Sequence, residues 1–126
     1  SYAEFKYQDI VVDKEEIELG DTLTISAELT NGGPVAAEEV VQLYVRDLVG
    51  SVTRPVRELK AFRRVRVEPG ETLTVAFELH TDDLAFFGRD NRRLTEPGEF
   101  HAWIGGSSET ELRTEFRISE SGQSPG

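Results

Sequence analysis

The chain has 126 residues, which is enough for one domain that buries roughly two thirds of its unfolded surface. It contains no cysteine, so a disulfide framework and a thiolate metal site are excluded. Fourteen basic residues against 24 acidic ones give a net charge of −10, which repels phosphate backbones and anionic lipid surfaces, and no apolar stretch approaches the roughly 20 residues that span a bilayer. We therefore expect neither nucleic acid nor a membrane as a partner.

Apolar and polar residues alternate along most of the chain, and this period of two is typical of strands with one buried face. The slipped spacing of apolar residues around Phe62 predicts a β-bulge. Glu68-Pro69-Gly70-Glu71 predicts a tight turn, because proline presets φ and glycine accepts a positive φ. One short helical turn is expected near residues 82–87, capped by Thr81 or Asp82. The predicted strands cover residues 5–12, 23–29, 41–45, 59–67, 73–79, 100–104 and 112–118.

About seven strands separated by turn signals at short intervals predict an all-β fold, a two-sheet sandwich of the immunoglobulin or fibronectin type III-like kind with Greek-key connections. One core uses every apolar strand position, so a second domain is not expected. We assign residues 1–120 to the domain and the small, polar residues 121–126 to a disordered tail.

The carboxylates are too closely spaced to indicate catalysis. A glycosidase needs two carboxyl groups that face each other across a cleft, whereas Glu15-Glu16-Glu18, Glu38-Glu39 and Asp82-Asp83 are neighbours on turns and strand ends. We interpret them as solvated surface charge, and no nucleophile elbow or phosphate loop is present. The sequence predicts no catalytic residue and no cofactor.

Metal binding is also not expected. His80 and His101 have no zinc spacing and are interpreted as surface residues. Oxygen ligands for calcium cluster at Asp82, Asp83, Asp90 and Asn91, but they lack the register of a calcium loop. Calcium binding by this cluster is therefore the less favoured alternative, and we expect a chain without a metal site.

Two aromatic residues stand apart from the core pattern. If Val41, Leu43 and Val45 face inward, Tyr44 faces outward, and Trp103 faces outward on its own strand by the same argument. On neighbouring strands they would form an aromatic patch. Ordinary cross-strand packing and docking against another protein surface both explain such a patch, and a platform for stacking on sugar is the least favoured of the three.

Four sequence stretches carry a family resemblance. They are Glu39-Val40-Val41-Gln42-Leu43-Tyr44-Val45-Arg46-Asp47, Arg54-Pro55-Val56-Arg57-Glu58-Leu59-Lys60-Ala61-Phe62, Val67-Glu68-Pro69-Gly70-Glu71-Thr72, and Glu96-Pro97-Gly98-Glu99-Phe100 with Gly105-Gly106-Ser107-Ser108. Together they resemble the C-terminal fibronectin type III-like domain of glycoside hydrolase family 3, the β-glucosidases and their relatives. The resemblance covers about residues 1–120, and the missing initiator methionine suggests a piece of a longer protein.

The resemblance implies a non-catalytic accessory domain that packs against the catalytic domains of a parent glycoside hydrolase and stabilises them. In this family the nucleophile and the acid/base come from the preceding domains, so no catalytic residue carries over. We expect the interdomain contact at Tyr44, Trp103, Arg54, Pro55, Arg57 and Phe62, where arginines can form charge-assisted bonds to acidic partners. A free-standing module that binds carbohydrate or protein is the alternative.

Overall fold

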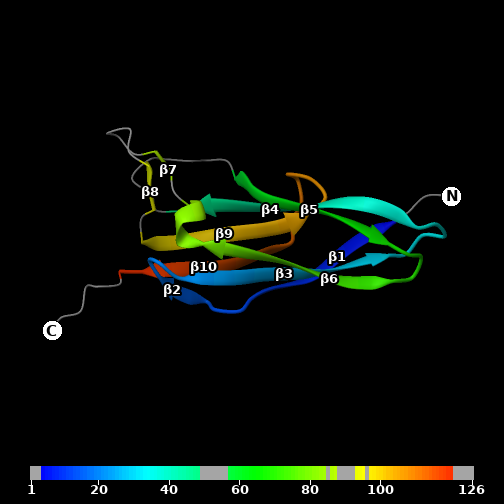
Figure 1. Cartoon of the computed structure of the whole chain (residues 1–126), viewed down its shortest axis with the longest axis horizontal. Coiled ribbons are helices and arrows are strands. Elements are labelled where there is room, and N and C mark those ends of the chain that lie inside the picture. Colours follow the sequence, from blue (N-terminus) through cyan, green and yellow to red (C-terminus); the bar gives the residue numbers. More distant parts are fainter. Residues whose placement is uncertain (1–3, 49–56, 85, 88–92, 96, 121–126) are drawn as a thin grey trace.

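The computed structural model describes residues 4–48, 57–84, 86–87, 93–95 and 97–120, and these form a sandwich of two sheets (Figure 1). The first sheet has the antiparallel order β1-β3-β6, and the second has the order β2-β10-β9-β4-β5. The predicted all-β sandwich is therefore confirmed. The strands of the sheets are β1 (Phe5–Val12), β2 (Glu16–Glu18), β3 (Thr22–Asn31), β4 (Ala37–Asp47), β5 (Glu58–Val67), β6 (Thr72–His80), β9 (Gly98–Gly105) and β10 (Arg113–Ser119).

The two sheets contain eight strands in the described part of the chain, the seven predicted ones and β2. β2 was missed because it offers a single apolar residue, Ile17, between two glutamates; Ile17 is nevertheless buried and its strand pairs in parallel with β10. A separate hairpin of β7 (Phe86–Phe87) and β8 (Arg93–Leu94) lies at one end of the sandwich (Figure 1).

The core lies between the sheets and is made of the inward-facing residues of the alternating strands. On β3 and β6 the buried residues alternate with more exposed ones, as one-sided burial requires. On the core side of the second sheet, the cross-strand partners Phe100 and Phe116 stack with ring centroids 5.1 Å apart. Burial of these side chains is the main source of the stability of the domain.

Two turns use the same hydrogen-bonding device. In the predicted turn, Glu71 N–H donates to Glu68 O (3.0 Å) and Glu68 N–H donates to the Glu71 carboxylate (2.9 Å), with Gly70 at φ 78°. Glu18 and Asp21 repeat both bonds at 2.9 Å, here with a glycine at φ 98° between them. In each turn, the carboxylate of the fourth residue thus accepts a hydrogen bond from the N–H of the first residue and adds to the backbone bond between them.

The predicted bulge is confirmed, two residues before Phe62. The register between β4 and β5 shifts where Leu43 pairs with Ala61 and Tyr44 pairs with Leu59, so Lys60 is the extra residue. A second irregularity in β1 places Asp9 at φ 59°, and it was not predicted.

The expected helical turn is shorter and earlier than predicted. A 3₁₀ helix, η1, covers Thr81–Leu84, and residues 86–87 are strand instead of helix. Its cap also differs from the prediction, because His80 Nδ1 accepts from Asp82 N–H (3.0 Å) and Asp83 accepts from His80 N–H (2.9 Å). Thr81 is not free to cap, since its hydroxyl accepts a hydrogen bond from Gly20 N–H (2.9 Å).

Candidate functional site

The outer face of the five-stranded sheet carries most of the residues that the sequence singled out. Val41, Leu43 and Val45 of β4 are fully buried against the core, so the alternate residues of this strand face away from it. Tyr44 and Trp103 are direct Cα partners between β4 and β9. The predicted pairing of these two aromatic residues on the outer face is confirmed.

The pair does not form the exposed patch that we expected, because only 8 % of Tyr44 and 7 % of Trp103 is accessible to solvent. The Arg57 guanidinium lies over the Trp103 ring, with its Cζ 4.0 Å from the ring centroid, and donates a hydrogen bond to Thr110 O (2.5 Å). His101 packs against the same indole in a T-shaped arrangement, with a centroid distance of 5.8 Å and an interplanar angle of 80°. These neighbours cover Trp103.

Tyr44 is held by polar neighbours. Its hydroxyl donates to Gln42 Oε1, and Gln42 Nε2 donates to Gly106 O (2.8 Å). These two hydrogen bonds link β4 to the segment after β9. The aromatic pair thus forms a second packed cluster, on the outer face of the sheet and separate from the core. Sequence alternation predicts which face of the sheet a residue lies on, but it does not predict that neighbouring side chains cover it there.

His101 is the titratable group of this cluster. Burial lowers its pKa below the ordinary value of 6.5, the cation of Arg113 lowers it further, and the Glu115 carboxylate opposes both effects. Arg113 NH1 lies 3.4 Å from His101 Nδ1, and Glu115 Oε2 lies 3.4 Å from His101 Nε2. The histidine is mostly covered, with 18 % of its side chain accessible, so its interpretation as a surface residue needs correction.

β5 is the open part of this face. Phe62 is 67 % exposed, and it pairs with Gln42 on the outer side of the sheet. Leu59, 49 % exposed, lies opposite Tyr44, and it was not among the residues expected at the interdomain contact. The bulge at Lys60 is the signal that could have found it, because one extra residue brings two apolar residues three apart onto one face. Arg54 and Pro55 lie outside the described residues.

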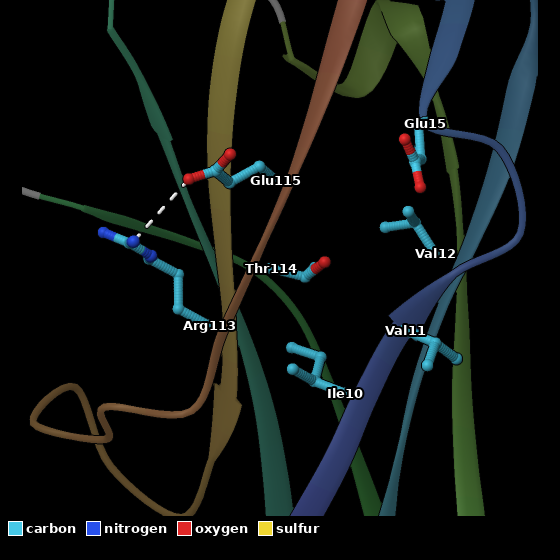
Figure 2. A pocket seen from close by; sticks show the side chains of 7 residues that line it. All are labelled: Ile10, Val11, Val12, Glu15, Arg113, Thr114 and Glu115. Atoms are coloured by element: carbon cyan, nitrogen blue, oxygen red, sulfur yellow. Dashed lines mark ion pairs between the residues drawn. The ribbon is translucent and has the colours of Figure 1, made fainter.

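A groove of about 480 Å³ opens at the seam between the sheets, where β1 meets β10 (Figure 2). Two carboxylates line it, Glu15 and Glu115, but Glu115 is turned toward Arg113, 3.6 Å from its NH2, and away from Glu15. They do not converge on a common point as an acid/base pair requires. We interpret the groove as the seam left where the chain passes from β1 in one sheet to β2 in the other.

The described residues contain no group of three His, Cys, Asp or Glu side chains arranged to hold a metal ion. Of the weaker calcium candidate, Asp82 and Asp83 belong to the turn around η1, while residues 90 and 91 lie outside the described part. No helix in the described part has the length and hydrophobicity of a membrane-spanning segment.

The chain is similar to parts of much longer enzymes. It is 43 % identical to a β-xylosidase of Formosa agariphila over 88 % of this chain and 15 % of the relative, and 41 % identical to thermostable β-glucosidase B of Acetivibrio thermocellus over 86 % and 14 %. A solved β-glucosidase involved in saponin metabolism from intestinal bacteria superposes on 94 % of this chain and 16 % of its own, with a TM-score of 0.88 and 39 % identity.

The chain thus spans about one sixth or less of these relatives. The fibronectin type III-like domain family matches residues 39–108, which include most of β4 and all of β5, β6 and β9. The chain therefore belongs to the fibronectin type III-like domain family, in the form found as a small part of the β-glucosidases and β-xylosidases of glycoside hydrolase family 3.

Proposed function

We propose that the chain is a non-catalytic accessory domain of a β-glucosidase-type glycoside hydrolase, and that it packs against the catalytic domains and stabilises them. The observation that carries the proposal is the share of each protein that aligns. The relatives align with nearly all of this chain and with only about 15 % of themselves, so most of each enzyme lies elsewhere.

The shape and chemistry of the chain support a role without catalysis. Its buried side chains fill the space between two sheets, and the carboxylates of the seam groove do not face each other across a cleft. Hydrolysis of a glycosidic bond needs two carboxyl groups at a defined separation on either side of the sugar. A β-sandwich with an exposed aromatic residue on one face is better suited to contact another domain.

Deletion of this domain from the full-length parent enzyme tests the proposal. We expect the thermal midpoint of the remaining catalytic part to fall and its half-life at the working temperature to shorten, because apolar surface that the domain covers becomes exposed. Hydrolysis of an aryl β-glucoside before and after heating measures the effect on activity.

Adding the separate chain to the truncated enzyme is the matched control. Partial recovery of the thermal midpoint is expected, since the contact is non-covalent and depends on concentration. The proposal fails if deletion changes neither the midpoint nor the heated activity. The pure chain alone should hydrolyse no aryl β-glucoside, and hydrolysis lost on substitution of a single carboxylate would assign it a catalytic role instead.

A further inference from the structure

Strand β5 differs in charge from the rest of the molecule. This strand contains Lys60, Arg63, Arg64 and Arg66 against one acid, Glu58, so its net charge is +3 in a chain of net charge −10. β5 is also the edge strand of its sheet. A concentration of positive charge on one edge of an acidic domain favours an acidic neighbour.

The same strand carries two of the exposed large hydrophobic residues in the described part of the chain. Phe62 is the most exposed of the large hydrophobic residues in the described part of the chain, at 67 %, and Leu59 follows on the same strand at 49 %. The other exposed large hydrophobic residues lie on other elements or loops, among them Val11 on β1 at 54 %. An apolar pair bordered by arginines is the composition of a docking surface with an apolar centre and a polar rim.

Protection of a free sheet edge explains only part of this composition. Lysine and arginine on an edge strand block edge-to-edge pairing with another sheet, but an exposed phenylalanine works against that protection. Arg63 has a separate role, because it lies over the Phe77 ring with its Cζ 5.9 Å from the centroid and covers the open side of the core. Among the described residues, Phe62 and Leu59 are not part of the core cluster and are open to solvent.

The arginines next to Phe62 are only weakly engaged within the domain. Arg64 NH1 lies 3.6 Å from Glu38, and Arg66 Nε lies 2.8 Å from Glu68, but more than half of each of these four side chains is exposed. Ion pairs this exposed contribute little to stability. Both guanidinium groups can therefore also bind carboxylates of a partner, at little cost to the domain.

We propose that the outer face of β5, formed by Leu59, Phe62, Arg64 and Arg66, docks against the catalytic part of the same polypeptide at an apolar site flanked by carboxylates. The inference rests on the proposed function and specifies the face through which it acts. It replaces Tyr44 and Trp103, which are covered within the domain, by residues that are open.

Thiol labelling of the full-length parent enzyme tests the face. Because this domain has no cysteine, Phe62→Cys and Val11→Cys each introduce one thiol whose peptide can be followed by mass spectrometry. We expect the thiol at position 62 to react about tenfold more slowly than the thiol at position 11 in the native enzyme, and equally fast in denaturant. Equal native rates would overturn the proposal.

Dilution separates the catalytic part from a second copy of the protein as the occupant. Protection of position 62 by the same polypeptide is independent of enzyme concentration. Protection that disappears on dilution would assign the face to self-association and overturn the proposal. If deletion of the domain destabilises the parent while position 62 stays reactive, only the assigned face is wrong.

Charge reversal tests the chemistry of the partner. Arg64→Glu should lower the thermal midpoint of the parent more than Lys6→Glu, a reversal on an exposed residue of β1, and the difference should shrink at high salt. The exchange Arg64→Glu with Glu38→Arg restores the pair within the domain but not a bond to the partner. An acidic partner predicts that the exchange does not recover the midpoint, and full recovery would overturn it.

Discussion

Asn31 is a fully buried polar residue at the end of β3, and all four hydrogen-bonding positions of its side chain are used. Its Oδ1 accepts from Gly33 N–H (2.9 Å) and Glu4 N–H (3.3 Å), and its Nδ2 donates to Val35 O (2.8 Å) and Val67 O (3.1 Å). One amide thus joins the start of the chain, the loop after β3 and the end of β5. A buried polar group is stable here because every donor and acceptor is satisfied.

Asn31→Ala should destabilise the domain by about 2–4 kcal/mol, because it leaves several buried backbone groups without partners. Thr30→Ala is the control, since it removes an exposed hydroxyl pair with Thr72 and should cost about 0.5 kcal/mol. Urea unfolding of both variants gives the two free energies. Equal values would contradict the role assigned to Asn31.

Gly105 ends β9 where the chain approaches Thr110. A Cβ at this position would lie 2.3 Å from the Thr110 Cβ, whereas one at Gly32 would meet nothing nearer than 3.9 Å. We expect Gly105→Ala to lower the free energy of unfolding by about 2 kcal/mol or more, and Gly32→Ala to change it by less than about 0.5 kcal/mol. Thermal unfolding followed by circular dichroism compares them, and a harmless Gly105→Ala would show that the turn adapts.

At the scale of single elements, the strand pair β4–β9 carries an aromatic cluster with little exposed ring surface. Stacking on a sugar ring needs an open aromatic face, and Arg57 covers one face of Trp103. Titration with glucans or xylans should therefore leave the fluorescence of the single tryptophan unchanged at millimolar ligand. The variant Arg57→Ala removes this cover and tests whether Arg57 is what blocks stacking on Trp103. A saturable response in the unsubstituted chain would support the carbohydrate-binding alternative.

The histidine of this cluster makes stability depend on pH. Burial, and Arg113 next, lower the pKa of His101 below its unfolded value of 6.5, and Arg46 acts in the same direction while Glu115 and Glu99 oppose it. The unfolded chain therefore binds more protons between the folded pKa and 6.5, so stability is present above 6.5 and is lost as the pH falls below it.

His101→Gln should remove this part of the pH dependence. The measurement is the urea midpoint of the chain and of the variant at about pH 7.5 and about pH 5.5, where most carboxylates stay ionised. We expect a smaller loss in the variant than in the unsubstituted chain. An equal loss in both would mean that His101 does not contribute.

Strand alternation carries enough information for the long strands of this fold and too little for its short elements. β3 and β6 alternate cleanly, so both faces could be predicted, whereas β2 has one apolar residue and is held by pairing with β10, a partner more than ninety positions away. The expected cap of η1 was not found because the Thr81 hydroxyl accepts a hydrogen bond from Gly20 N–H, a residue far away in the sequence. Such long-range contacts leave no periodic signal.

At the scale of the whole molecule, the candidate surface could be predicted in part. The expectation that every apolar strand position fills the core is wrong for Phe62, because the register beyond the bulge puts it on the outer face opposite Gln42, with 67 % of it exposed. Alternation does place Tyr44 and Trp103 on the outer face, and their pairing between β4 and β9 confirms it. It does not indicate that Arg57 covers Trp103 while Phe62 stays open, because exposure depends on side chains from other segments. The positive charge of β5 is visible in the sequence, but its position on a sheet edge is not.

Scanning calorimetry of the full-length parent enzyme, compared with this chain alone, tests the central claim of stabilising contact most directly. If the domain packs against the catalytic part, the two unfold in one coupled transition, and the domain melts at a higher temperature in the parent than alone. A separate transition in the parent at the temperature of the isolated chain would contradict the account.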